Sequence, residues 1–367
     1  MIYLDSSSTT KPKSEVIDYT INILRNNWGN PSSIYEYGME SKRIIENARR
    51  TVAEFINAEP EEIYFTPSAS ASNAIATGCF MKENSRFYNF ITTNIEHSSI
   101  NKYFHKDVWK YYEKVDENGF VNAEQFKKYR KSLVSVMAAN NEIGSIQPIK
   151  EICSVVKENM CVFHSDLTQY IPYFKVDVKE LGLDMASFSA HKLGGLKGCG
   201  VFYKNKDIKV NPLVFGSQQD GIMAGTENIY GIAALGKAIE LIDYSKTNEI
   251  RKKRDYLLEN LLKIEGIKLN GSIENRLPNN INIRIDGVCI ENQQILAMLD
   301  IEGYCLSAGS ACNSYEKTPS HVLKAIGLSD SEANRSIRIT ISEENTYEEL
   351  DKFVIDLKNI VDQFKNI

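Results

Sequence analysis

The chain has 367 residues, of which 43% are hydrophobic and 25% are charged, and this balance excludes a disordered protein. The formal net charge is −5 and no basic block is present, so we expect no direct nucleic-acid partner and no anionic membrane surface as a partner. A chain of this length usually exceeds one compact core, so we expect a large domain and a smaller one.

The short elements in the first two thirds of the chain alternate between strand and helix patterns. Apolar residues at helical spacing over 44–55 predict a helix, and EEIYF at 61–65 predicts a strand. Further apolar, β-forming runs predict strands at 86–93, 132–139, 160–166, 184–190 and 200–204, with a helix at 150–159 between two of them. This alternation predicts an α/β fold with buried, mainly parallel strands and helices on both faces of the sheet.

The last third has a different arrangement. GTENIYGIAALGKAIELIDY predicts one long helix over 225–244, and the charged segment after it continues helically. Strand-like runs at 280–285 and 336–341 then alternate with helices, and an amphipathic helix ends the pattern at 347–364. We therefore predict a large domain over 13–245 and a small domain over 246–367, which the segment 1–12 joins.

The N-terminal stretch and the cysteines bear on location and metal binding. MIYLDSSSTT has no basic region followed by an apolar one, and no run approaches the roughly 18 apolar residues of a membrane span. The seven cysteines are scattered and never spaced as CxxC, so neither a disulfide framework nor a metal site is expected. We expect a cytoplasmic protein whose cysteines are mostly buried.

Polar residues follow several of the predicted strands. Ligands of open α/β sheets bind beyond the carboxyl ends of the strands, so Asp166, Lys192 and His97 are expected to meet in one crevice. A single exposed lysine is ordinarily just solvated. The combination nevertheless suits pyridoxal 5′-phosphate, because a lysine amine can bind its aldehyde covalently and a carboxylate can keep its pyridine nitrogen protonated.

An anionic cofactor also needs hydrogen-bond donors for its phosphate. Ser70, Ser189, His191 and the backbone N–H groups at the start of the helix after TPSASASN are the candidates. A serine before a helix is more often a plain N-cap, so Ser70 alone is weak evidence. The candidates count as a group.

An ordered series of motifs resembles the cysteine desulfurases of the NifS and IscS kind, which are class V aminotransferase, fold type I pyridoxal-phosphate enzymes. The resemblance covers nearly the whole chain. Its motifs are YLDSSSTT, GNPSSIYEYG, IEHSS, NNEIGSIQPI, HSDLTQ, SFSAHKLGGLKGCGVFY, AGTEN, SAGSACNS, PSHVLKAIG and SIRITI. It implies a homodimer of the PLP-dependent transferase fold.

The resemblance also implies roles around the cofactor ring. Lys192 would be covalently linked to pyridoxal 5′-phosphate, and Asp166 would pair with the ring nitrogen. Gln169 would hydrogen-bond the phenolic oxygen, and His97 would stack on the ring. For the phosphate, the resemblance adds a residue of the second subunit to the candidates already named: Thr226.

The substrate side is implied in the same way. Arg338 would clamp the carboxylate of L-cysteine with Asn141 adding a hydrogen bond. The Cys312 thiolate would take the sulfur as a persulfide, release L-alanine, and pass the sulfur to an acceptor protein from an exposed, flexible loop. The acceptor would be an iron–sulfur scaffold or a tRNA thiolation enzyme. The catalytic set is therefore Cys312, Lys192 and His97.

Some positions depart from the pattern that the chain resembles. Ser68 and Ala71 stand where a glycine and a glutamate are usual, and Asp220 and Met223 replace two arginines. LDNAATT becomes LDSSSTT, and Tyr35 replaces a histidine. Acidic partners would be bound differently at such an entrance, so we expect a divergent paralogue with a dedicated partner.

Two other interpretations stay open from the sequence. One keeps the cofactor but changes the reaction, to an aminotransferase, a selenocysteine lyase or another β-lyase, because fold does not settle the reaction. The other is a scaffold or regulatory paralogue without turnover, which the presence of Lys192, Asp166 and Cys312 disfavours.

Overall fold

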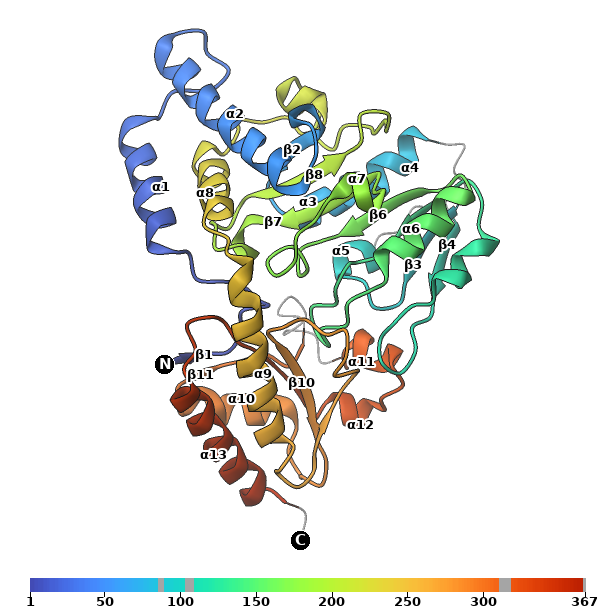
Figure 1. The fold of residues 1–367 in the computed structure, drawn as a ribbon, viewed down its shortest axis with the longest axis vertical. Helices are drawn as coiled ribbons and strands as arrows, with labels where there is room; N and C mark the ends of the chain where they lie inside the picture. The colour runs from blue at the N-terminus through green and yellow to red at the C-terminus, as the bar shows by residue number, and fades with distance from the viewer. Residues whose placement is uncertain (85–88, 103–108, 310–317, 366–367) are drawn as a thin grey trace.

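The computed structural model describes residues 1–84, 89–102, 109–309 and 318–365 (Figure 1). A seven-stranded sheet with the order β2-β8-β7-β6-β5-β3-β4 forms the centre of the larger part. Its strands are β2 (Ile63–Thr66), β3 (Asn89–Thr93), β4 (Trp109–Glu113), β5 (Ser132–Ser135), β6 (Val162–Asp166), β7 (Met185–Ser189) and β8 (Gly200–Lys204).

The middle of this sheet is parallel, from β4 through β3, β5 and β6 to β7. Every residue of β5, β6 and β7 is buried, which explains why these strands are near-continuous runs of apolar and small residues. Their carboxyl ends therefore lie along one edge, where the predicted site residues follow.

The strand β8 differs from the expected parallel pattern, because it pairs antiparallel with both β7 and β2. Residues 190–199 join β7 to β8 and hold only the 3₁₀ turn Ala190–Lys192. A parallel neighbour needs a crossover of a dozen or more residues, usually through a helix. The short connection therefore turns the chain back and places Lys192 directly at the end of β7.

Helices pack around this sheet, and α8 contacts both α1 and α2 at one end of it (Figure 1). The helices of the larger part are α1 (Ser14–Asn26), α2 (Glu36–Ile56), α3 (Ala69–Ala74), α4 (Phe80–Glu83), α5 (Ser98–Asn101), α6 (Ile149–Glu158), α7 (Val178–Leu181) and α8 (Ile229–Glu240). The helix α2 is capped by Asn57, the residue after its last turn. Asn57 has a left-handed backbone (φ 55°), and its N–H donates to carbonyl groups of that last turn.

The long helix predicted over 225–244 is wrong in extent. The helix α8 begins at Ile229, because the side chain of Asn228 accepts a hydrogen bond from Gly231 N at 3.1 Å and caps it. It ends at Glu240, and a separate 3₁₀ turn precedes α9 (Thr247–Leu261). The apolar periodicity of the sequence continues past both ends of α8, so only the capping residues indicate where the helix begins and ends.

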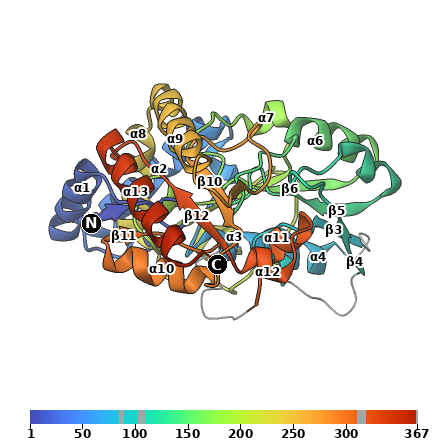
Figure 2. The same cartoon turned by 90° about the horizontal axis from the view of Figure 1, so that it is seen from below.

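The smaller part has its own sheet and core. The strand β10 (Asn280–Ile285) pairs antiparallel with β9 (Ile267–Leu269) and β12 (Ser336–Thr340). Figure 2 shows α9, α10 and α13 around β10 and β12. The remaining elements are α10 (Asn292–Ile301), β11 (Tyr304–Cys305), α11 (His321–Ala325), α12 (Asp330–Ala333) and α13 (Tyr347–Gln363).

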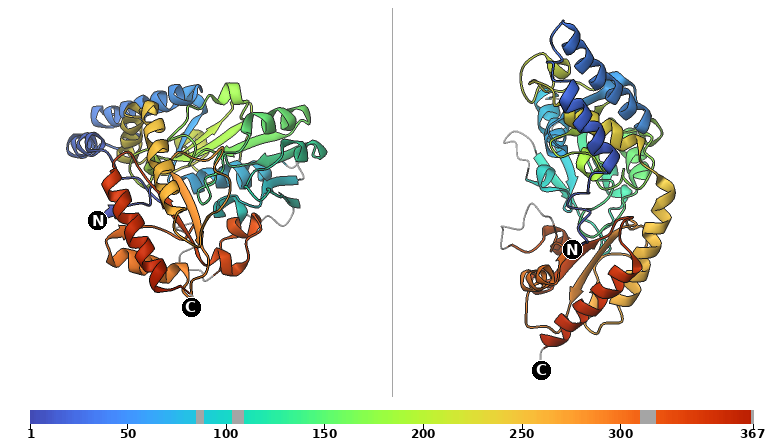
Figure 3. Two further views of the ribbon diagram at one scale, coloured as in Figure 1. Left: turned by 60° about the horizontal axis from the view of Figure 1, so that its bottom comes forward. Right: turned by 90° about the vertical axis from the view of Figure 1, so that its left-hand side faces the viewer.

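The N-terminal segment packs with this smaller part. The strand β1 (Ile2–Tyr3) pairs in parallel with β11, and Leu4 belongs to the same hydrophobic core as residues of β10, β12 and α13. Figure 3 shows α9 leading from one part of the molecule to the other. On the basis of these two cores we propose that the chain divides near residue 245, although α11 and α12 contribute Val322, Leu323 and Ala333 to the core of the larger part.

Within the described residues, no helix combines the length and the apolar character that a bilayer crossing requires.

Candidate active site

A pocket of about 170 Å³ lies at the carboxyl ends of β5, β6 and β7, against the first turn of α3 and the segment after β1. Most of the residues predicted from the sequence line it together. They are Ser70, His97, Asn141, Asp166, Gln169, Ser189, His191, Lys192 and Arg338. Residues from both cores therefore meet at one place.

Lys192 reaches from the turn after β7 toward the N-terminal segment. Its Nζ donates hydrogen bonds to the carbonyl oxygen of Ser8 at 2.6 Å and to that of Ser7. The Ser7 carbonyl also accepts a hydrogen bond from Gln169 Nε2 at 3.0 Å. The backbone of Ser7 and Ser8 thus holds two of the predicted cofactor residues on one side of the pocket.

Asp166 ends β6 and is held on both oxygens. Its Oδ2 accepts a hydrogen bond from Asn73 Nδ2 at 2.8 Å, and its Oδ1 accepts one from the backbone N–H of Thr168 at 3.0 Å. These two hydrogen bonds fix the orientation of the Asp166 carboxyl group before any ligand enters the pocket.

His164 lies two residues before Asp166 in β6 and is fully buried. Its ring nitrogens pair with Ser135 Oγ at 2.8 Å and Ser187 Oγ at 2.9 Å. Burial lowers the pKa of His164 to about 4, against the opposing influence of the Asp166 charge. The ring is neutral at pH 7 and links three adjacent strands beneath the pocket.

His97 follows β3 and is the N-cap of the short helix α5. Its Nδ1 accepts a hydrogen bond from the backbone N–H of Ser99 at 3.2 Å and lies 2.8 Å from Ser99 Oγ. An accepting Nδ1 leaves the proton of the neutral ring on Nε2. The cap therefore fixes both the tautomer and the orientation of the ring at the pocket wall.

The first turn of α3 gives the pocket a set of hydrogen-bond donors. Ser68, and not Ser70, is the N-cap, since its side chain accepts a hydrogen bond from Ala71 N at 3.2 Å. Ser70 is exposed in the first turn and lines the pocket. The usual capping explanation for a serine thus applies to Ser68 and leaves the Ser70 hydroxyl available to a ligand.

Ser189 and His191 flank the end of β7. Ser189 is buried, and its hydroxyl lies at the 3.5 Å limit of a hydrogen bond to Cys199 O. His191 Nδ1 lies 3.1 Å from Thr9 Oγ1. Burial, followed by the charges of Lys192 and Lys197, lowers the pKa of His191 to about 4. The ring is neutral at pH 7 and can donate one hydrogen bond to an anion.

Arg338 belongs to β12 and is 1% exposed, so it is no surface residue. Its Nη2 donates to Asp5 Oδ1 at 2.8 Å and to Ser8 Oγ at 2.6 Å, and its Nη1 donates to the backbone carbonyl of Asn141 at 2.9 Å. Ser307 Oγ also donates to Asp5 Oδ1, at 3.0 Å. The guanidinium is thereby fixed in orientation at the edge of the pocket.

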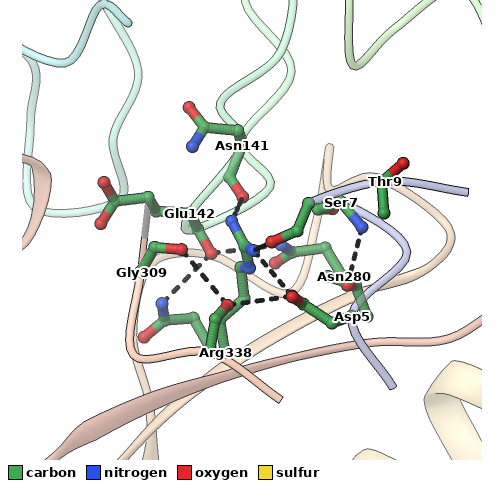
Figure 4. Close-up of polar contacts among 12 residues, drawn as sticks. Asp5, Ser7, Thr9, Asn141, Glu142, Asn280, Gly309 and Arg338 are labelled. Carbon is green, nitrogen blue, oxygen red and sulfur yellow. Dashed lines mark hydrogen bonds and ion pairs between the residues drawn. The ribbon is translucent and has the colours of Figure 1, made fainter. Parts of the chain in front are cut away.

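Asn141 lines the pocket, but its contact with Arg338 is made by the backbone carbonyl, and Figure 4 shows the side-chain amide pointing away from the guanidinium. The neighbouring Glu142 is buried, and its backbone carbonyl accepts hydrogen bonds from the side chains of Asn280 and Asn282 at 3.1 Å each. This loop after β5 therefore joins the two cores at the site.

Two polar atoms without hydrogen-bond partners indicate that the pocket fits pyridoxal 5′-phosphate. Asn73 Oδ1 and Thr168 Oγ1 are buried and have no hydrogen-bond partner among the described residues, although buried polar atoms are nearly always paired. Both residues line the pocket and both hold Asp166 through other atoms. A polar ring ligand beside Asp166 would satisfy them, with the amine of Lys192 available to its aldehyde.

Two predicted residues are not in this pocket. Thr226 is exposed and does not line it, which leaves its predicted contact to the pocket of a second subunit. Cys312 lies outside the described residues, which stop at Gly309 and resume at 318. Cys305 is only partly buried, whereas the sequence predicts cysteines that are mostly buried.

Sequence reasoning missed several residues that hold the site together. Asp5 and Ser8 contact Arg338, the Ser7 carbonyl contacts Lys192 and Gln169, and Asn73 contacts Asp166. All of them lie in stretches that were singled out as motifs, LDSSSTT and TPSASASN. The motifs therefore contained these residues. Their contacts could not be predicted, because no local pattern shows that the N-terminal segment packs against Lys192 and Arg338.

Comparison with known proteins agrees with this geometry. The aminotransferase class-V family model matches residues 2–353. The chain is 39% identical to cysteine desulfurase IscS of Methanosarcina thermophila over 100% of this chain and 93% of the relative. It is 40% identical to cysteine desulfurase IscS of Clostridium botulinum strain Hall, over 99% of this chain and 94% of the relative.

Solved structures agree as well. A NifS-like protein superposes with a TM-score of 0.92 at 31% identity, covering 99% of this chain and 100% of that chain. A structure described as SspA in complex with cysteine superposes with a TM-score of 0.82 at 28% identity, covering 94% of this chain and 100% of that chain.

The α/β fold, with its mainly parallel sheet and the pocket at the strand ends, defines an enzyme that uses pyridoxal 5′-phosphate. The chain belongs to the aminotransferase class-V family. The fold class and the family resemblance predicted from the sequence are thereby confirmed.

Proposed function

We propose that the protein is a cysteine desulfurase, which converts L-cysteine to L-alanine and transfers the sulfur to an active-site cysteine. The carrying observation is that Lys192 and Asp166, at strand ends of the seven-stranded sheet, line one pocket with Arg338 of the three-stranded sheet. An amine, an anion and a buried guanidinium in this arrangement suit an amino-acid substrate and an aldehyde cofactor. The relatives named cysteine desulfurase and the neighbour solved with cysteine support the choice of substrate.

Pyridoxal 5′-phosphate supplies, when bound, an electron-withdrawing ring next to the substrate Cα. Lys192 would hold it covalently, and its Nζ would also carry the proton of the substrate Cα. Asp166 would keep a proton on the ring nitrogen, and Asn73 and Thr168 already orient its carboxyl group. His97 would stack on the ring face, and Gln169 would donate to the phenolic oxygen.

The phosphate and the substrate would be bound at opposite ends of the pocket. Ser70, Ser189 and His191 would bind the phosphate together with Thr226 of a second subunit. Arg338 would bind the substrate carboxylate, and a guanidinium held in one orientation needs little reorganisation to do so. Asn141 would support Arg338 through its carbonyl.

Cys312 would be the sulfur-accepting nucleophile. Its thiolate would attack the substrate sulfur while the carbon–sulfur bond breaks. The bonding electron pair would go to the carbon, which takes up a proton and leaves as L-alanine, and the sulfur would remain on Cys312 as a persulfide. An acceptor protein then removes it, and we propose an iron–sulfur scaffold or a tRNA thiolation enzyme as that acceptor. We further propose a homodimer in the cytoplasm, where the six described cysteines, all unpaired, would stay reduced.

The test combines covalent trapping with product analysis. Borohydride treatment of the purified protein should fix a pyridoxyl group at Lys192, and L-cysteine should yield alanine with added sulfur mass on the Cys312 peptide. The Cys312→Ala variant should keep the trapped cofactor and lose the sulfur transfer. Pyruvate and ammonia, or exchange with a keto acid, would contradict the desulfurase and favour another enzyme of the same family.

A further inference from the structure

The guanidinium of Arg338 has few N–H groups left for a ligand. A guanidinium has five N–H donors, and Nη2 uses both of its own, on Asp5 Oδ1 and Ser8 Oγ, while Nη1 uses one on the carbonyl of Asn141. The Nε–H group is buried and has no partner among the described residues. Only Nε and one hydrogen of Nη1 are therefore available.

These two remaining N–H groups cannot bind one carboxylate together. A carboxylate bridges either Nη1 and Nη2 or Nη2 and Nε, because only those pairs present parallel N–H bonds. Both pairs include Nη2. A bidentate carboxylate on Arg338 must therefore displace one of the two groups that occupy Nη2.

Ser8 is the weaker of these two groups. Asp5 is an anion, and its Oδ1 is held by Ser307 Oγ as well as by Arg338, so removing it would leave a buried positive charge unpaired. Ser8 contributes a neutral hydroxyl and is only partly buried at the pocket wall. Charge-assisted bonds to an anion are stronger than bonds to a neutral acceptor.

We propose that Ser8 determines the affinity for the substrate carboxylate by occupying Nη2 of Arg338 until the carboxylate displaces it. The inference rests on the proposed function, since it takes Arg338 as the carboxylate-binding residue. It is particular to this chain, because the pattern that the sequence resembles has alanine at position 8 and therefore no hydroxyl to displace. The hydroxyl weakens binding and excludes ligands that cannot form both bonds.

The experiment compares Ser8→Ala with Ser6→Ala in the holoenzyme. Both remove one hydroxyl from the same segment, but the Ser6 hydroxyl makes no hydrogen bond to a described residue. The dissociation constant of L-alanine is measured from the change in the visible absorption of the cofactor. Ser8→Ala should bind L-alanine about 3 to 10 times more tightly than the wild type, which is the range of one net hydrogen bond, and Ser6→Ala should match the wild type.

L-alanine methyl ester, which keeps the amine but has no carboxylate, is the control ligand. It should bind Ser8→Ala and the wild type equally, which also shows that the variant is folded. If Ser8→Ala binds L-alanine no more tightly than Ser6→Ala, the inference is overturned while the proposed function stands. If Ser8→Ala tightens the binding of L-alanine and of the methyl ester equally, Ser8 does not act on the carboxylate and the inference fails. A wild type without L-alanine binding would overturn the proposed function and the inference together.

Discussion

At the scale of single residues, the buried carboxyl of Glu96 lies beside the predicted ring-stacking histidine. Glu96 is 0% exposed, and its carboxyl accepts hydrogen bonds from Thr93 Oγ1 at 2.6 Å and Met137 N at 3.0 Å. Burial raises the pKa of Glu96 to about 8, although these hydrogen bonds lower it. The group is therefore protonated in the folded protein at pH 7 and ionised in the unfolded chain.

Glu96→Gln should change how stability depends on pH. Because the folded pKa lies above the unfolded value of 4.5, the contribution of Glu96 is fully present below pH 4.5 and is lost as pH rises through about 8. Glutamine has the shape of the protonated acid and does not ionise. In urea unfolding, the free energy of unfolding of the variant should rise relative to that of the wild type between pH 5 and pH 9. The rise should be at most about 1.4 kcal/mol for each pH unit. A constant difference across this range would contradict the assignment.

The ion pair between Asp5 and Arg338 should be structurally important, because it is nearly buried. The two side chains are 15% and 1% exposed. Asp5→Asn should lower the free energy of unfolding by about 3 kcal/mol, the range for removing one partner of a buried pair. Saturating L-alanine should recover part of this loss, because its carboxylate supplies the missing charge.

Glu344→Gln is the matched control for this prediction. It breaks the ion pair between Lys11 and Glu344, whose side chains are 73% and 61% exposed. Exposed pairs contribute about 0 to 1 kcal/mol, so thermal or urea unfolding should hardly change. A similar loss of unfolding free energy in both variants would contradict the prediction that burial makes the Asp5–Arg338 pair more important for stability.

At the scale of elements, the close packing of β8 against the start of α3 positions the predicted phosphate site. A Cβ added at Gly200 would lie 2.4 Å from the backbone C of Ser68 and 2.7 Å from Ala69 N. Gly200→Ala should therefore displace the first turn of α3 and weaken cofactor binding at least tenfold, measured by titrating the apoprotein with pyridoxal 5′-phosphate. Unchanged affinity would show that this turn does not hold the cofactor.

The elements also show what local sequence patterns could predict. The strand ends at Asp166 and Lys192 were readable, because buried strands are apolar runs and polar residues mark where they stop. The antiparallel β8 and the true ends of α8 were missed, since strand direction depends on connection length and helix ends depend on caps such as Asn228. The role of Asn73 in holding Asp166 depends on the approach of α3 to β6, which no single segment encodes.

At the scale of the whole molecule, Thr226 is exposed and outside the pocket, so its predicted phosphate contact requires a second copy of the chain. Large apolar side chains are also exposed at the end of α1 and before α2, including Trp28 at 67% and Ile34 at 94%. Such exposure is typical of surfaces that a partner covers. The protein should sediment as a dimer.

Mixed dimers test whether the sites are shared. Lys192→Ala and Thr226→Ala should each impair both sites of their own homodimer. Suppose that Thr226 acts on the cofactor of the partner subunit. A mixed dimer then has one site with both changes and one site with neither. Co-expression of the two variants should restore about half of the wild-type borohydride-trapped cofactor per mixed dimer at full affinity. Cofactor of reduced affinity in every site would place Thr226 on its own subunit's cofactor.

The pairing of β1 with β11 has a consequence for synthesis on the ribosome. Ile2 pairs with Tyr304, and the N–H of Ser6 donates to the carbonyl of Thr340, so residues 2–6 reach their partners only after residue 340 has been translated. The large sheet can form while the nascent chain is still growing, because domains generally fold in the order of synthesis. Asp5 can pair with Arg338 only when translation has passed residue 340, so the proposed carboxylate site is among the last parts of the molecule to form.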